Sequence, residues 1–216
     1  MNSFSYLSYK DCKAHDQYLL KNGHTMSSLI HTAGKLISAW IIDQVPNRPL
    51  VGIIGKGNNG NDILSTFNHF PIDIDYQYLI IDPKIKKSPH YQKLPSHKEI
   101  TSLSELPKDA VIIDGIFGTG LNKPLETAIE ALIKTINQLS NTVIAIDIPS
   151  GLSEKNDNLC IKANTTLSMM FPKKVFLNPT KKEKCGEIYV LNFKLTQDER
   201  NGHKFPNLTD NYIKIL

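Results

Sequence analysis

This chain of 216 residues lacks features that several classes of protein require, and those classes are therefore not expected. It has only three cysteines, Cys12, Cys160 and Cys185, which lie far apart and form no C-x-x-C pair. A disulfide framework or a zinc site is therefore not expected, and a reducing cytoplasm is the natural location. The sequence also lacks H-E-x-x-H and G-x-S-x-G patterns, so nothing in it predicts a zinc protease or a serine hydrolase with a nucleophile elbow.

Long apolar runs are absent as well. No run approaches the roughly 20 residues that a membrane-spanning helix needs, and the first residues do not read as a signal peptide. The formal net charge is only +4, and its two basic clusters, at 84–87 and 181–184, are short. We expect no membrane and no nucleic-acid partner, because a nucleic-acid surface needs denser basic charge; an anionic small molecule fits the mild excess. The length and the 40% hydrophobic content suit one domain over residues 1–216.

The pattern of apolar residues predicts an α/β fold. An N-terminal arm of two helices is expected, from the N-cap Ser8 to about Asn22, and from Thr25 or Ser27 to the prolines at 46 and 49. Strands and helices then alternate over residues 50–146, which indicates a mostly parallel, doubly wound sheet. The expected strands are 50–54, 76–81, 110–113 and 142–146, followed by short ones at 164–169, 175–177 and 187–192. From Thr196 onward the chain is polar and expected to be peripheral.

Three polar loops follow expected strands, at Gly57–Asp62, Asp114–Pro124 and Asp147–Gly151. In doubly wound sheets, ligands bind at the carboxyl ends of the strands. The first loop can be interpreted as a glycine-rich turn in which Asp62 caps the next helix. It can also be interpreted as a site whose amide oxygens bind a cation and whose N–H groups bind a phosphate. Asp114, Asp147 and Ser150 could likewise bind a metal or carry out acid–base chemistry.

Taken in order, these loops resemble the YjeF N-terminal domain family, the NAD(P)H-hydrate epimerases. The resemblance rests on Gly57-Asn-Asn-Gly-Asn-Asp62, Asp114-Gly-Ile-Phe-Gly-Thr-Gly-Leu-Asn-Lys-Pro-Leu125 and Asp147-Ile-Pro-Ser-Gly-Leu152. Weaker similarities occur at Leu29–Gly34, Asp82–Lys84 and Cys185–Ile188, so the resemblance covers roughly residues 10–195. It implies a Rossmann-like three-layer αβα domain with its helical arm, usually a homodimer.

The resemblance also implies an isomerase that interconverts the R and S forms of hydrated NADH and NADPH, called NADHX and NADPHX. A separate S-specific dehydratase would then restore the cofactor. By residue-to-residue matching, Asp147 and Lys84 are the implied acid–base groups, and Asn59, Asp114 and Ser150 the implied potassium ligands. The implied substrate-binding residues are Asn58, Asn59, Gly60, Asn61, Asp62, Gly118, Thr119, Gly120, Leu121, Asn122, Lys123, Pro124 and Asp147.

This sequence departs from the family pattern at three places. Asn61 and Ile63 replace glycines of the first loop, and His31, which could reach a pocket, replaces a glutamate. These departures motivate an alternative: a catalytically inactive domain of the same fold that binds a nucleotide or docks a partner. A dimerising platform in an RNA-decay scaffold is less favoured, because no long RNA-binding extension is present. A dehydratase is also disfavoured, because that activity belongs to a different, ATP-dependent domain.

Overall fold

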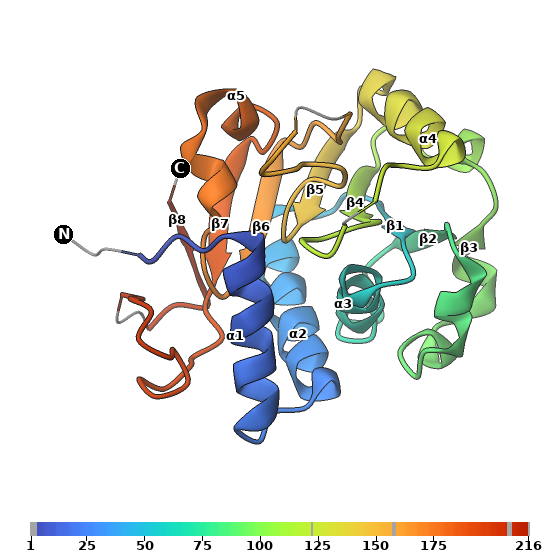
Figure 1. The fold of residues 1–216 in the computed structure, drawn as a ribbon. Coiled ribbons are helices and arrows are strands. Elements are labelled where there is room, and N and C mark those ends of the chain that lie inside the picture. The colour runs from blue at the N-terminus through green and yellow to red at the C-terminus, as the bar shows by residue number, and fades with distance from the viewer. Residues whose placement is uncertain (1–3, 122, 157–158, 207–208, 216) are drawn as a thin grey trace.

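A computed structural model describes residues 4–121, 123–156, 159–206 and 209–215. In these residues eight strands form one sheet in the order β3-β2-β1-β4-β5-β6-β7-β8 (Figure 1). All neighbouring strands are parallel except β7 and β8, which are antiparallel. The strands are β1 Leu50–Ile54, β2 Tyr76–Ile80, β3 Glu99–Ile100, β4 Val111–Gly115, β5 Thr142–Ile146, β6 Thr165–Met169, β7 Glu187–Leu191 and β8 Tyr212–Lys214.

Helices cover both faces of this sheet. They are α1 Tyr9–Lys21, α2 Met26–Gln44, α3 Asn58–Phe67, α4 Thr127–Gln138 and the short α5 Pro179–Lys182. One core cluster joins α2 and α3 to the sheet, through Trp40, Leu64 and Ile113 among others. A second cluster joins α4 to the opposite face, through residues such as Ile133 and Val51. The alternating side chains of the central strands therefore feed two cores, and the three-layer αβα fold is confirmed.

The N-terminal helical arm forms as its capping residues predict. Ser8 caps α1, with its Oγ accepting from the Asp11 N–H, while the Asp11 carboxylate accepts from the Ser8 N–H. Thr25 and Ser28 form the equivalent reciprocal pair at the start of α2. Each capping box satisfies two N–H groups that the helix itself leaves unpaired. No helix of the described residues combines the length and apolarity that crossing a membrane requires.

Two local expectations were wrong, and two short strands were missed. The segment 175–177 belongs to a 3₁₀ turn, Lys174–Leu177, rather than a strand. Two short strands, β3 and β8, were missed, because two or three residues give too little periodicity to detect. Helix α3 begins at Asn58, with Gly57 as its N-cap, so Asp62 lies inside the helix and does not cap it.

The strand order places a ligand site beside β1. The chain moves outward from β1 to β2 and β3, then returns to β4 on the other side of β1. This reversal is the topological switch point, where doubly wound sheets leave a crevice at the carboxyl ends of the strands. The first turn of α3, which follows β1, and the loop after β4 flank that crevice. The first two predicted loops therefore lie at the switch point of the fold.

Candidate functional site

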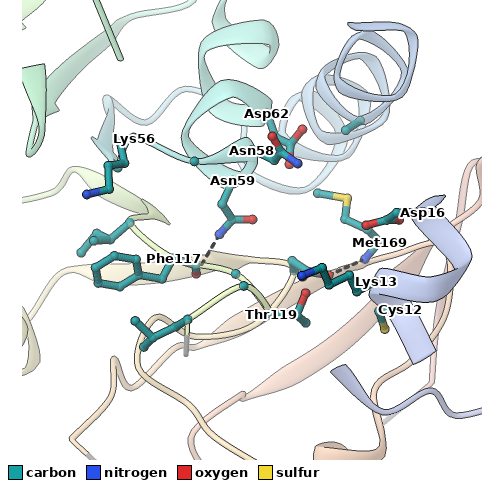
Figure 2. A pocket seen from close by; sticks show the side chains of 18 of the residues that line it. Cys12, Lys13, Asp16, Lys56, Asn58, Asn59, Asp62, Phe117, Thr119 and Met169 are labelled. Carbon is teal, nitrogen blue, oxygen red and sulfur yellow. Dashed lines mark hydrogen bonds between the residues drawn. The ribbon is translucent and has the colours of Figure 1, made fainter. Parts of the chain in front are cut away.

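A cavity of about 910 Å³ opens at this switch point. Its volume lies near the upper end of the range for small-molecule sites. Figure 2 shows three groups of side chains around it: Asn58, Asn59 and Asp62 from α3, Phe117 and Thr119 from the loop after β4, and Cys12, Lys13 and Asp16 from α1. Met169 at the end of β6 lies near the α1 residues. The N-terminal arm thus supplies one wall of the cavity.

Asn59 ties the first two loops together. Its side-chain N–H₂ donates to the Phe117 carbonyl oxygen at 3.0 Å (Figure 2) and to the Ile146 carbonyl oxygen at 2.9 Å. The other end of the amide, Oδ1, faces Gly118: a Cβ added to that glycine would lie 3.2 Å away. Asn59 is only 6% exposed. One buried side chain therefore joins the strand ends of β4 and β5 to the first turn of α3.

Asp114 and Ser150 form a second buried connection. The Ser150 Oγ donates to one Asp114 carboxylate oxygen at 2.6 Å, and the Ser150 N–H donates to the other at 2.8 Å. The Phe117 N–H donates to Ser150 Oγ at 2.8 Å. Both Asp114 and Ser150 are fully buried. Burial raises the pKa of Asp114 to about 6, although hydrogen bonds from Ser150 and Ile116 oppose the increase.

Asp147 introduces a carboxylate into the cavity from the end of β5. Its φ is 67°, a left-handed conformation that is uncommon for a residue with a side chain. One carboxylate oxygen, Oδ1, lies 2.5 Å from the Lys173 Nζ. The other, Oδ2, would lie 3.3 Å from a Cβ at Gly118, so it faces the same glycine as the Asn59 amide.

Two more carboxylates lie in the field of Asp147. Burial raises the pKa of Asp62 well above its usual value, and Asp147 and Asp16 add to the increase. Burial also raises the pKa of Asp16 to about 6, again with a contribution from Asp147. Carboxyl groups in different protonation states around one cavity can serve as acid and base toward a bound molecule.

The structure brings most of the predicted substrate-binding residues to the cavity. They are Asn58, Asn59, Asp62, Gly118, Thr119, Gly120, Leu121, Lys123, Pro124 and Asp147. Asn122 lies outside the described residues. Gly60 and Asn61 do not line the cavity. The Asn61 side chain turns away, donating to the Gly57 carbonyl oxygen and accepting from Ser88 Oγ at 2.5 Å.

Two other predicted residues also lie away from the cavity. Lys84 is exposed, and its main-chain N–H donates to the carboxylate of the N-cap residue Asp82 at 3.0 Å. His31 is exposed too, and its ring packs against His69 with centroids 4.6 Å apart. Neither residue lines the cavity, so the structure does not bring the proposed acid–base lysine to Asp147.

Sequence reasoning missed Cys12, Lys13, Asp16 and Lys173, all of which line the cavity. The first three face it only because α1 packs against the segment after β6, and such a contact leaves no short-range pattern. Burial raises the pKa of Cys12 to about 12, so its thiol is not a nucleophile at neutral pH. Lys173 had one available signal: a lysine in the largely apolar segment Met169–Val175.

The space at Gly118 can be tested with a single methyl group. Gly118→Ala places a Cβ between the Asn59 Oδ1 and the Asp147 Oδ2, closer than a normal van der Waals contact. A displacement of a few tenths of an ångström at the reacting groups should lower the kcat/KM for the reaction at this site roughly tenfold. Gly120→Ala is the comparison: Gly120 also lines the cavity, but nothing of the protein lies within 4 Å of its added Cβ, so the loss of activity should be smaller. Equal activities in the two variants would contradict the placement of the site at Gly118.

The layers, the switch-point crevice and the three polar loops define a doubly wound α/β domain with a small-molecule site at its strand ends. The family model described as YjeF-related protein N-terminus matches residues 26–175. The chain belongs to this family.

Several curated relatives are similar over most of their length. The chain is 26% identical over 201 residues to an NAD(P)H-hydrate epimerase of Oenococcus oeni, covering 86% of this chain and 94% of the relative. It is 24% identical over 230 residues to an NAD(P)H-hydrate epimerase of Plasmodium knowlesi, covering 98% of this chain and 78% of the relative. The crystal structure of yeast ynu0 shares the fold, with a TM-score of 0.79 at 18% identity, covering 98% of this chain and 100% of that one.

Proposed function

We propose that this chain is an NAD(P)H-hydrate epimerase, an isomerase that interconverts the R and S forms of NADHX and NADPHX in the repair of nicotinamide cofactors. Family membership and relatives bearing that name support the assignment. The observation that carries it is the meeting of three strand-end loops around one cavity, where the Asp147 carboxylate is held. Such an edge suits a nucleotide, because the first turn of α3 presents N–H groups and a positive helix end.

The chemistry requires a proton donor and a proton acceptor. The epimeric carbon, C6, carries a hydroxyl group next to the ring nitrogen. The nitrogen lone pair can expel this hydroxyl, which takes a proton from an acid and leaves as water, and a C=N⁺ bond forms. Water then adds to the other face of C6 and gives its proton to a base, so atoms and charge balance. Asp147 is the proposed base, and Asp62 and Asp16, with their raised pKa values, are carboxyls that can hold the proton to be donated.

A coupled assay tests the assignment. R-NADHX is supplied together with an S-specific dehydratase, and the recovery of NADH is followed at 340 nm, with K⁺ present. The protein should accelerate NADH recovery in proportion to its concentration. Unchanged recovery, with nucleotide binding still measurable, would establish the inactive binding domain instead.

That alternative rested on three departures from the family pattern, and none of them alters the cavity lining. Asn61 points toward Gly57 and Ser88, while His31 lies on the surface against His69. Ile63 is fully buried, and its side chain packs beneath Gly115 of β4. None of the three side chains lines the cavity, and the active enzyme remains the better-supported function.

We also propose that Asn59, Asp114 and Ser150 hold a potassium ion; Asp114 and Ser150 are in contact, and both Asn59 and Ser150 hydrogen-bond the backbone of Phe117. The donor set supports this, because amide, carboxylate and hydroxyl oxygens are the ligands that hard cations prefer. Asp114 gives further support: it is fully buried, and none of the ion pairs in the described part of the chain includes it. A cation would compensate this buried charge and hold the loops after β4 and β5 in place. Among the described residues no cluster of three or more His, Cys, Asp or Glu side chains offers a transition-metal site.

Removal of K⁺ should lower the thermal stability of the protein. A ligand at 100 times its Kd stabilises by about 2.7 kcal/mol, which for a chain of this size corresponds to a Tm increase of about 5 °C or more. Differential scanning fluorimetry in potassium chloride against tetramethylammonium chloride of equal ionic strength measures this difference. Ser150→Ala should abolish the cation dependence, and a Tm that is the same in both salts for the native protein would contradict the site.

Three further expectations remain part of the proposal. A homodimer and a cytoplasmic location are supported by the family resemblance, and the mass in solution, measured by light scattering, tests the dimer. A separate dehydratase as metabolic partner is supported by a relative in Dictyoglomus turgidum named bifunctional NAD(P)H-hydrate repair enzyme Nnr. This chain is 28% identical to it over 162 residues and covers 31% of its length.

A further inference from the structure

Lys173 is a charged residue in an unusual position. It follows β6, and its side chain is only 3% exposed. Its Nζ lies 3.1 Å from Ser168 Oγ, 2.9 Å from the Met169 carbonyl oxygen and 3.0 Å from the Phe171 carbonyl oxygen. With the Asp147 Oδ1 at 2.5 Å, four oxygens surround a group that has three hydrogens to donate. The ammonium group is therefore fixed in place by the chain around it.

Neighbouring acidic groups offset the unfavourable free energy of burying the Lys173 charge. Burial alone would lower the pKa of Lys173, but Asp147, together with Cys12 and Asp16, raises it above the usual value. Lys173 therefore stays charged at neutral pH. A buried charge persists only when it is paired and hydrogen-bonded, and this one satisfies both conditions.

The pair gives the two oxygens of Asp147 different environments. Oδ1 lies against Lys173 and within 3.5 Å of the Met169 N–H. Oδ2 faces Gly118, on the cavity side. The backbone at Asp147 is left-handed, and its N–H donates to the Leu167 carbonyl oxygen at 2.8 Å. Strained backbone of this kind persists where surrounding contacts hold it, and it is typical of functional sites.

We propose that Lys173 is the positioning residue of this site: its ammonium group supplies the counter-charge of Asp147 and holds Oδ1, so that Oδ2 faces the substrate space beside Gly118 and Asn59. The proposal rests on the epimerase function and deepens it, because a carboxylate must be unprotonated to accept the proton of the entering water. The cationic partner of Asp147 is thus a buried residue after β6, whereas Lys84, the lysine expected as second acid–base group, is exposed.

Other charges act on the pair from the elements packed around it. Helix α1 contributes Tyr9, Cys12 and Asp16, and α3 contributes Asp62. None of these groups is positively charged, so none can replace the counter-charge that the Lys173 ammonium gives to Asp147. Removing the Lys173 ammonium should therefore let a proton bind Asp147 at higher pH than in the native protein.

The test compares Lys173→Met with Lys173→Arg in the coupled assay across pH 5–9. We expect Lys173→Met to lower kcat/KM at pH 7 at least about tenfold and to move the acidic limb of the pH–rate profile up by about one unit or more. Lys173→Arg should keep the limb close to its native position. Lys181→Met is the matched control: Lys181 is also buried, but it donates to the Ser153 and Glu154 carbonyl oxygens and does not line the cavity.

A measurement independent of activity separates this proposal from the function on which it rests. In protein labelled with ¹³C at the aspartate carboxyl carbons, the Asp147 signal should change from that of a carboxylate to that of a carboxyl group at a higher pH in Lys173→Met than in the native protein. That result with an inactive native protein would overturn the epimerase function alone. An active native protein whose pH profile and Asp147 signal are unchanged in Lys173→Met would overturn the role of Lys173.

If Lys173→Met does not fold, Ser168→Ala carries the test. It removes one acceptor of the Lys173 Nζ and leaves the charge of the pair intact. A smaller shift of the acidic limb in the same direction is expected, and an unchanged limb would contradict the proposal.

Discussion

Asp147→Asn should lower kcat for NADHX epimerisation by about 10²- to 10⁴-fold, the contribution typical of a positioned general acid or base. The amide keeps the shape of the carboxylate but cannot accept the proton. It also leaves the Lys173 ammonium without its counter-charge, 2.5 Å away in the native protein. Some stability should be lost as well, on the order of 1–3 kcal/mol, because a buried charged donor loses its strongest acceptor.

These two effects must be measured separately. Urea denaturation gives the loss of stability, and the coupled assay at a temperature where the variant is fully folded gives the loss of rate. Asp73→Asn is a suitable control, because Asp73 is exposed and does not line the cavity. It should leave both quantities unchanged. A folded Asp147→Asn variant with nearly native kcat would exclude Asp147 as the base.

The elements and loops that sequence predicted well are those specified by neighbouring residues. The capping boxes at Ser8 and Thr25 and the apolar run of β1 each lie within a few residues, so their signals are local. The meeting of the three loops also followed from the sequence, because parallel strands bring their carboxyl ends to one edge. Asp147 was therefore predicted at the site and is found there.

The residues that were missed depend on contacts between distant segments. Asp16 enters the cavity only because α1 packs beside the chain after β6, where Leu7 and Lys173 form a parallel bridge. Lys84, by contrast, was predicted at the site but does not lie there. It matched a family turn in sequence, but its place is fixed by the local cap of Asp82, which leaves its side chain exposed. Lys84 was predicted as a second acid–base group, whereas the lysine that pairs with Asp147 in the structure, Lys173, was not predicted.

Gly60→Ala should destabilise the fold by about 3 kcal/mol or more, because three backbones meet at this point without room for a methyl group. A Cβ at Gly60 would lie 2.0 Å from the Gly55 carbonyl oxygen, and a Cβ at Gly55 would lie 2.0 Å from the Ile116 carbonyl oxygen. Backbone atoms of β1 and of the turn after β4 cannot move aside as a flexible side chain would. In a solvent-exposed helix the same substitution would raise the free energy of unfolding by up to about 1 kcal/mol, because alanine has the higher helix propensity. The sign of the measured change therefore shows whether helix propensity or close backbone packing dominates at this position.

The matched control is Gly57→Ala, three residues earlier at the N-cap of the same helix, where nothing lies within 4 Å of an added Cβ. It should cost less than about 1 kcal/mol. Denaturant titration should therefore separate the two variants clearly, and the Tm of Gly60→Ala should fall by about 6 °C or more. If Gly60→Ala is instead as stable as Gly57→Ala, α3 does not lie against β1 as closely as the structure places it. Because Asn59 adjoins Gly60 and bonds the Phe117 and Ile146 carbonyl oxygens, any outward shift of α3 must also stretch these bonds, and activity should fall with stability.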